Sequence, residues 1–106
     1  MSKYDLIIVI CNHGFSEEVM ETAKSHGARG GTIMHGRGTA AHEVKKFFGI
    51  TISPEKDIIL IVVEEQYTNP IMQAINSEHG INKEPHAICL SLPVDDTIGF
   101  NFDSQE

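Results

Sequence analysis

Basic residues, cysteines and long apolar runs are scarce in this sequence, and each scarcity excludes a class of protein. The chain has 8 lysines and arginines against 15 aspartates and glutamates among 106 residues, so its net charge is -7 at pH 7. A chain this acidic repels nucleic acid, so we expect no nucleic-acid partner. The apolar run near the N-terminus is far shorter than the ~20 residues of a membrane span, so we expect no direct insertion into a membrane.

The scarcity of cysteine argues against a disulfide-stapled secreted protein. Only Cys11 and Cys89 occur, and both lie inside apolar stretches, where a cysteine is more often a small core side chain than a disulfide partner or a metal ligand. We therefore interpret both as free thiols. The stretch "MSKYDLIIVIC" is not followed by the small-residue cleavage site of a secretory signal, so we expect a cytoplasmic protein.

The residues that are present predict one domain over 1–106, because 41% hydrophobic residues suffice for a single core at this length. Ser16 is typical of the cap of a first helix. Asn69 and Pro70 predict the cap and first position of a second helix that ends at Gly80. Apolar, β-branched runs predict strands over 6–11, 32–35, 58–63 and 87–94.

This order of elements is that of a ferredoxin-like βαββαβ fold, an α+β sandwich with two helices on one face of a four-stranded antiparallel sheet. The strands over 6–11 and 58–63 are apolar at nearly every position, so the face without helices is apolar too. Contiguous apolar patches of this kind mark interfaces. We therefore predict an obligate oligomer whose sheets pack together, with Ile8 and Ile61 as candidate interface residues.

A long connection over 36–56 separates the second and third strands. Connections of about twenty residues are uncommon in compact domains and are more often functional than accidental. Within it Val44, Phe47 and Phe48 fall at helical spacing, which favours a short helix whose aromatic side chains pack against the rest of the protein. The alternative is that the two phenylalanines form a hydrophobic docking point for a partner.

Two stretches, "GARGGTIMHGRGT" before the long connection and "SLPVDD" in the last strand, resemble the P-II family of trimeric nitrogen-regulatory signalling proteins, and most of all its compact P-II-like branch. The resemblance extends over nearly the whole chain. It implies a homotrimer with its sheets packed together and adenine nucleotide bound in the clefts between subunits. It also implies that the loop over 36–56 corresponds to the T-loop, through which the family engages target proteins.

The resemblance also implies an effector site. Its matching or flanking residues are Thr32, His35, Gly36, Arg37, Gly38, Thr39, His86 and Ala87, the last pair lying in the short B-loop. Glycines allow the backbone to approach a phosphate closely, and arginine offers a bidentate fork. The Gly-Asp-Gly-Lys signature of the B-loop is replaced by "KEPHAI", and two C-terminal arginines are replaced by Gly99 and Asn101. We therefore expect Arg37 to provide much of the binding of ATP, ADP, AMP or another small anionic effector.

The function implied is a regulatory one of the nitrogen-regulation type. The protein would sense the effector in its clefts and report through the loop over 36–56 to a regulated enzyme or a membrane transporter. We expect no enzymatic activity of its own, because Cys11 and His13 stand too close in sequence to act as nucleophile and base. No nucleophile elbow and no pair of carboxylates at a defined cleft is recognisable either.

The histidines support an alternative function, that of a divalent metal-binding trimer similar to the CutA proteins. In the expected topology the first and last strands are antiparallel neighbours, so His13 and His86 lie at the same end of the sheet. Two imidazoles and one oxygen ligand would suit zinc or copper. No close spacing of two histidines on one helix supports the hypothesis further.

Overall fold

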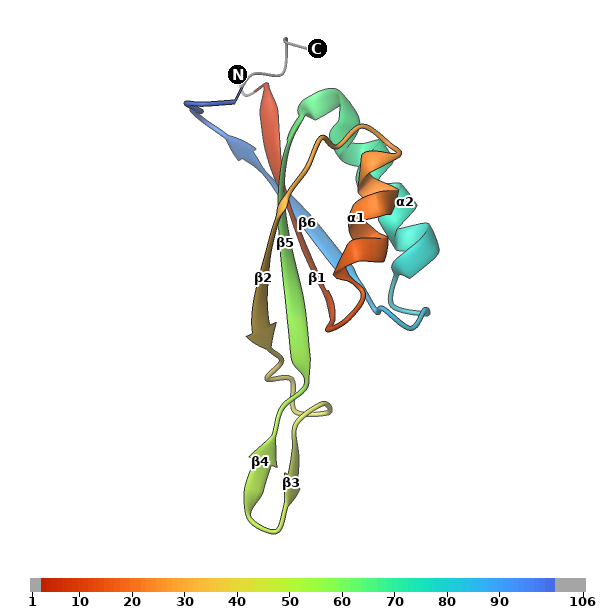
Figure 1. The fold of residues 1–106 in the computed structure, drawn as a ribbon, viewed down its shortest axis with the longest axis vertical. Coiled ribbons are helices and arrows are strands. Elements are labelled where there is room, and N and C mark those ends of the chain that lie inside the picture. Colours follow the sequence, from red (N-terminus) through yellow and green to blue (C-terminus); the bar gives the residue numbers. More distant parts are fainter. Residues whose placement is uncertain (1–2, 101–106) are drawn as a thin grey trace.

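The computed structural model describes residues 3–100 and shows two helices on one face of an antiparallel sheet, with a hairpin extending beyond it (Figure 1). The elements, in chain order, are β1 (Tyr4–Asn12), α1 (Ser16–Lys24), β2 (Thr32–Arg37), β3 (Lys45–Phe47), β4 (Ile50–Ile52), β5 (Glu55–Glu64), α2 (Glu65–His79) and β6 (Ile88–Val94). Neither helix is long and apolar enough to cross a membrane, among the residues described.

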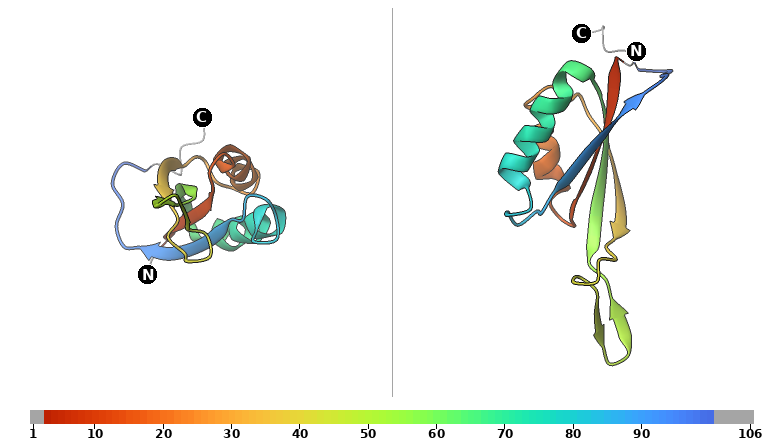
Figure 2. Two further views of the ribbon diagram at one scale, coloured as in Figure 1. Left: turned by 90° about the horizontal axis from the view of Figure 1, so that it is seen from below. Right: turned by 180° about the vertical axis from the view of Figure 1, so that it is seen from behind.

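The main sheet has the strand order β2-β5-β1-β6, and all three pairings are antiparallel. The predicted ferredoxin-like fold is therefore confirmed. Strands β1 and β2 finish, and β5 and β6 begin, at one end of the sheet. We call it the loop end, because the hairpin leaves the sheet there (Figures 1 and 2).

The core lies between the sheet and the two helices, which gather on one side in both views of Figure 2. Alternate residues of the two central strands point into it, and Ile7, Val9, Ile59 and Ile61 are completely buried. The helices contribute a further set of completely buried side chains, which are Val19, Ala23, Ile71 and Ile75. Cys11 belongs to this core as a free thiol, and burial raises its pKa to about 11.

Helix α2 begins four residues before the predicted cap at Asn69, so Pro70 lies inside the helix and not at its first position. The chain enters the helix directly from β5, without a loop. The backbone N–H of Glu65 donates to the carbonyl of Lys3 (3.0 Å), and the Thr68 hydroxyl donates to the carboxylate of Asp5 (2.7 Å). These contacts to β1 and the residue before it hold an extra first turn, in spite of the donor that Pro70 lacks.

The expected helix in the long connection is wrong, because β3 and β4 form a hairpin there. Phe48 and Gly49 make its two-residue turn, and both have positive φ (51° and 80°), as a type I′ turn requires. The expected packing of the aromatic side chains is also not found: Phe47 is 62% and Phe48 92% exposed. The β-branched stretch 50–52 and the two-residue turn favour strand pairing over the helical spacing of three residues.

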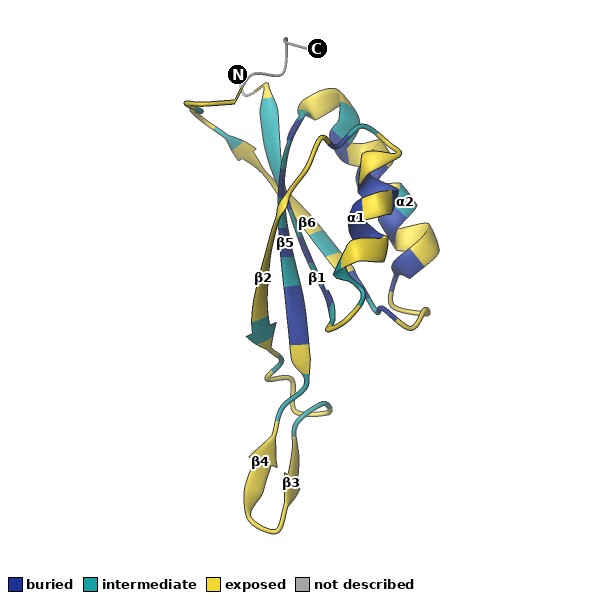
Figure 3. Cartoon of the chain, viewed as in Figure 1, coloured by how far each residue is buried: buried dark blue, intermediate teal, exposed yellow. Residues whose placement is uncertain are grey.

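The sheet face without helices, which we call the open face, is apolar, as predicted. Strand β6 at its edge is largely exposed (Figure 3). Ile88, Leu90 and Leu92 of β6 are 40–51% exposed on it. The neighbouring strands add half-buried residues of the same kind, which are Leu6, Ile8, Ile10, Ile58, Leu60 and Val62. Ile61 pairs with Ile7 and is completely buried toward the helices, so the prediction that it is an interface residue is wrong. Ile8 does lie on the open face, as predicted.

Candidate functional site

Two adjacent residues of β5, Lys56 and Asp57, build two separate polar sites at the loop end. Side chains alternate along a strand, so Lys56 belongs to the open face and Asp57 to the helix-covered face. Both residues are buried, with 8% and 1% of their surface exposed. Buried charges need partners, and each of the two has a different set.

The first site is a pocket of about 350 Å³ around Lys56 on the open face, which we call the Lys56 pocket. The root of the long connection forms one wall with Arg37, Gly38 and Thr39, and His86 forms another. Apolar residues of three strands complete it, namely Ile10, Ile58 and Ile88. The structure therefore brings four of the predicted effector residues together.

The other predicted effector residues lie elsewhere. Thr32 lines a separate hollow with Leu60 and Val62, and Ala87 is buried in the core with 3% of its surface exposed. His35 contacts Asp57 on the helix-covered face. Gly36 is paired with Lys56 inside β2, which puts it beside the pocket without lining it.

Lys56 lines the pocket although no pattern in the sequence marks it as a site residue. Its Nζ donates to Oδ1 of Asn12 (2.9 Å) and to Oε2 of Glu43 (2.9 Å), and only 10% of the side chain is exposed. The hydrogen bond from Lys56 lowers the pKa of Glu43. Because Glu43 belongs to the long connection and Lys56 to the sheet, this ion pair ties the loop to the pocket.

Gly38 allows the connection to pass close to Lys56. A Cβ on this residue would lie 3.0 Å from Oε1 of Glu43 and from Cε of Lys56, and 3.1 Å from Cγ of Pro54. The backbone N–H of Gly38 also donates to the carbonyl of Pro54 (2.8 Å), which closes the root of the loop. Strand β2 therefore continues through Gly36, and at Gly38 the chain passes close to the side chains of Lys56 and Pro54.

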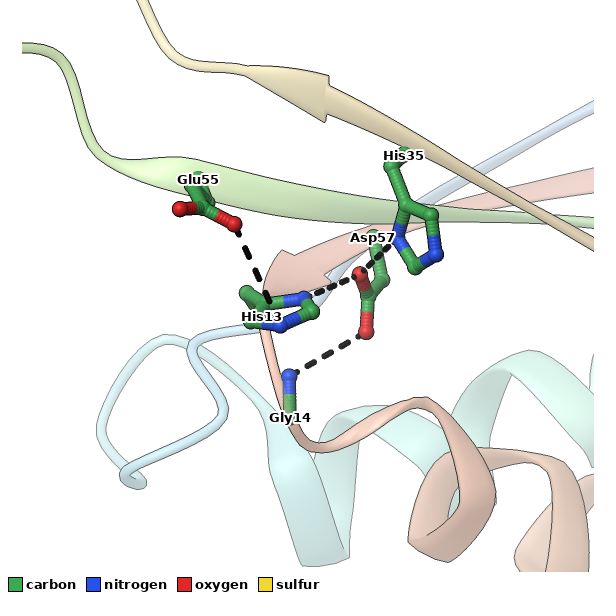
Figure 4. A network of polar contacts seen from close by, with 5 residues as sticks. All are labelled: His13, Gly14, His35, Glu55 and Asp57. Carbon is green, nitrogen blue, oxygen red and sulfur yellow. Dashed lines mark hydrogen bonds and ion pairs between the residues drawn. The ribbon is translucent and has the colours of Figure 1, made fainter.

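The second site is formed by His13, His35 and Asp57, which we call the histidine cluster (Figure 4). Oδ1 of Asp57 lies 2.8 Å from Nδ1 of His13 and 2.9 Å from Nδ1 of His35. The backbone N–H of Gly14 donates to Oδ2 of Asp57 (3.2 Å). The two rings meet edge to face, with their centroids 5.4 Å apart.

The electrostatics of the cluster favour a charged Asp57. Burial alone would raise the pKa of this carboxyl group, but hydrogen bonds from His13, His35, Gly14 and Ser16 outweigh it and lower the pKa to about 2. The hydrogen bond and the charge of Asp57 in turn raise the pKa of His13. The cluster thus holds a permanent negative charge beneath two imidazoles.

The predicted metal pair of His13 and His86 is corrected by this arrangement. Both residues do lie at the loop end, as expected from the antiparallel pairing of β1 and β6. However, His86 lines the Lys56 pocket on the open face, whereas His13 joins His35 and Asp57 on the other face. The sheet separates the two histidines, because register alone fixes the end of a sheet and not the face.

We expect Asp57→Asn to change the pH dependence of stability in two places. A pKa lowered from 3.8 to about 2 stabilises the fold above pH ~4, and that contribution is lost as the pH falls toward 2. The raised pKa of His13 has the opposite effect on the pH dependence of stability. Its stabilising contribution is present at low pH and is lost as the pH rises through that pKa. The variant should lack both dependences.

Urea unfolding between pH 2 and 9 measures the two effects, and the NMR titration of His13 should show its pKa returning toward 6.5. Lys24→Gln, a change of one charge at the exposed end of α1, is the control. An unchanged His13 titration in Asp57→Asn would contradict the pairing.

Comparison with known proteins relates the fold to that of PII proteins. The chain aligns with a protein of Thermus thermophilus described as a putative PII-like signaling protein (18% identity, TM-score 0.67, 88% of this chain and 87% of that one). It also aligns with Arabidopsis thaliana PII bound to citrate (21%, 0.66, 92% and 81%) and with the Bacillus subtilis GlnK-ATP complex (16%, 0.66, 92% and 88%). No protein-family model and no curated protein sequence matches the chain. At these identities the likeness shows a shared fold.

Proposed function

We propose that this chain is a P-II-like regulatory protein that binds a small anionic effector in the Lys56 pocket and reports its presence through the loop over 36–56. The observation that carries the proposal is the ion pair between Lys56 and Glu43, which makes one buried cation common to the pocket and the loop. The PII fold supports it, because solved structures of two proteins with that fold contain citrate and ATP, both of which are anions.

The charges around the pocket suit an anion, in spite of the net charge of -7 for the whole chain. Arg37 and Lys56 line the pocket together with His42 and His86, and Glu43 is the one carboxylate among its lining residues. An anion that contacts Nζ of Lys56 would compete with Glu43 for the same charge. Its binding would therefore break the ion pair that ties Glu43 of the loop to the sheet, which is a means of signalling.

A homotrimer would complete the pocket. Ile10, Ile58 and Ile88 line it from the open face, where they are incompletely covered in one chain. A second copy packed on that face would bury these residues and close the pocket from the side of the solvent. We therefore place the effector in a cleft between subunits, and adenine nucleotides are the first candidates to test.

The hairpin supplies a surface for the protein that receives the signal. Phe47, Phe48, Ile50 and Ile52 are all more than half exposed on it, and it projects from a molecule 55 Å long (Figure 1). Exposed aromatic and aliphatic side chains of this kind act as anchors in protein interfaces. A regulated enzyme or a membrane transporter that offers an apolar cleft would be such a partner.

A thermal-shift screen with ATP, ADP, AMP, citrate and 2-oxoglutarate tests the proposal, because a ligand that binds only the folded state raises the melting temperature. Arg37→Ala should weaken the selected anion by ~1.5–3 kcal/mol, the range for a charge-assisted hydrogen bond, as measured by isothermal titration. Arg29→Ala removes the other arginine of the chain, which lines a different hollow, and is the matched control.

The two variants test whether Arg37 binds the effector or is only the last residue of strand β2. Weaker binding in Arg37→Ala with unchanged binding in Arg29→Ala supports the Lys56 pocket. Equal affinity in the wild type and in Arg37→Ala, with the assembly intact, would remove Arg37 from the site. A screen in which none of these anions raises the melting temperature would count against the proposed effector class.

A further inference from the structure

We infer that His13, His35 and Asp57 form a binding site for a divalent transition-metal ion, on the face of the sheet opposite to the Lys56 pocket. Three different parts of the chain supply the ligands: the turn after β1, strand β2 and strand β5. One ligand atom from each lies within 4.8 Å of the other two. Figure 4 shows the two imidazoles approaching the same carboxylate from two sides.

The spacing of the ligand atoms fits a single ion. Imidazole nitrogen and carboxylate oxygen bind such ions at about 2.0–2.2 Å, so two ligand atoms stand roughly 3 Å apart in octahedral and roughly 3.4 Å apart in tetrahedral coordination. The distances from Oδ1 of Asp57 to the two Nδ1 atoms are 2.8 and 2.9 Å. An outward movement of the exposed rings by a few tenths of an ångström would admit a tetrahedral ion. Two histidines and one carboxylate on one face of an ion leave its remaining positions open to water.

The groups behind the ligands hold them in orientation. The N–H of Gly14 donates to Oδ2 of Asp57 at 3.2 Å, which leaves Oδ1 directed at the imidazoles. On the far side of His13, Oε1 of Glu55 lies 3.9 Å from Nε2, which is too long for a hydrogen bond but adds a second negative charge near the ring. The backbone of Gly14 is therefore the support of the Asp57 ligand.

The burial of Asp57, the exposure of the two histidines and the charge of the carboxylate are also typical of a metal site. Asp57 is held beneath the surface with 2% of its side chain exposed, whereas His13 and His35 are 52% and 71% exposed. The anion is thus fixed by the protein, and the imidazoles can reach an ion from solvent. The buried carboxylate of Asp57 is a fixed negative charge, which attracts a cation.

The competing arrangement is a plain hydrogen-bonded cluster, in which each Nδ1 carries a proton and donates it to Asp57. A metal ion requires the lone pairs of the same two nitrogens, so it displaces those protons. The two arrangements differ in which ring atom is protonated and in whether an ion changes this. The inference is independent of the proposed effector function, because it concerns other residues on the other face.

Titration of the full chain with Zn²⁺ in chelator-treated buffer, followed by calorimetry, tests the site. We expect one ion per chain, and a loss of affinity of about a hundredfold or more in both His13→Gln and His35→Gln, since each removes one of three ligands. His35 is exposed on an edge strand, so its variant should keep the fold even if a change at Asp57 does not. His26→Gln, at an exposed helix end, is the matched control.

Long-range nitrogen–proton NMR spectra identify the ligating atoms. Binding should shift Nδ1 of both His13 and His35, and leave the ring nitrogens of His26 unchanged. Zn²⁺ that binds equally well to His13→Gln and His35→Gln, or that shifts other histidines in their place, would overturn the site. So would an absence of binding at millimolar Zn²⁺.

Discussion

Ile8→Glu is expected to convert the assembled protein into folded single chains. Ile8 pairs with Leu60 on one side and Leu90 on the other, at the centre of the open face. If sheets pack together there, the change places an unpaired charge in the interface, which costs on the order of 3–5 kcal/mol. That is a factor of more than a hundred in the dissociation constant.

Light scattering after gel filtration measures the effect. The wild type should have a mass of three times 11.7 kDa, and Ile8→Glu should elute as a folded chain of 11.7 kDa. Ile50→Glu makes the same change at an equally apolar but exposed position of the hairpin, and its mass should remain that of the wild type. A wild type that is monomeric at micromolar concentration would contradict the proposed assembly.

Ile61→Ala is expected to destabilise the chain itself by ~2–5 kcal/mol, because it leaves a cavity in the layer between the sheet and the helices. Ile61 is completely buried and pairs with Ile7, which is completely buried as well. Leu60→Ala is the matched control, since the neighbouring residue of the same strand belongs to the open face. It should weaken assembly more than it weakens the fold.

Urea unfolding at several protein concentrations separates these two losses. The loss in Ile61→Ala should persist at every concentration. The loss in Leu60→Ala, relative to the wild type, should be present where the wild type is assembled and should disappear on dilution to single chains. Equal and concentration-dependent losses in both variants would mean that the two faces of β5 do not have the separate functions assigned to them.

The periodicity of the sequence was sufficient to predict the fold. Short apolar, β-branched runs identify β1, β5 and β6, and Gly80 marks the end of α2, because each of these signals depends on neighbouring residues in the chain. The start of α2 could not be predicted in the same way. It is held by Lys3 and Asp5, which lie about sixty residues earlier in the sequence and reach the helix only through the pairing of β1 in the sheet.

In the hairpin, an apolar spacing that is typical of a helix predicts the wrong secondary structure. Val44, Phe47 and Phe48 do have helical spacing, but three apolar positions are weak evidence beside a two-residue turn at Phe48 and Gly49. The turn was not recognised because its first residue is phenylalanine, and positive φ is uncommon for an aromatic residue.

Only some residues of each candidate site can be predicted from the sequence, because local patterns do not show which distant residues meet on one face of the sheet. The resemblance to the P-II family singles out Arg37 between its two glycines, whereas Lys56 gives no signal beyond one charge before an apolar strand. His13 is predicted as a metal ligand together with His86, since topology indicates which ends of strands meet. Only the pleat, which separates Lys56 from Asp57, decides the face.

The ion pair of Lys56 and Glu43 has a consequence for the energetics of the whole protein. If the effector and Glu43 compete for the ammonium group of Lys56, the effector binds more tightly to molecules in which the ion pair is broken. A partner that binds the loop in this state has the same preference. Linkage is reciprocal, so the factor by which the effector improves partner binding is the factor by which the partner improves effector binding. A cell could then hold the effector on this protein by supplying more of the partner, without any change in the concentration of the effector.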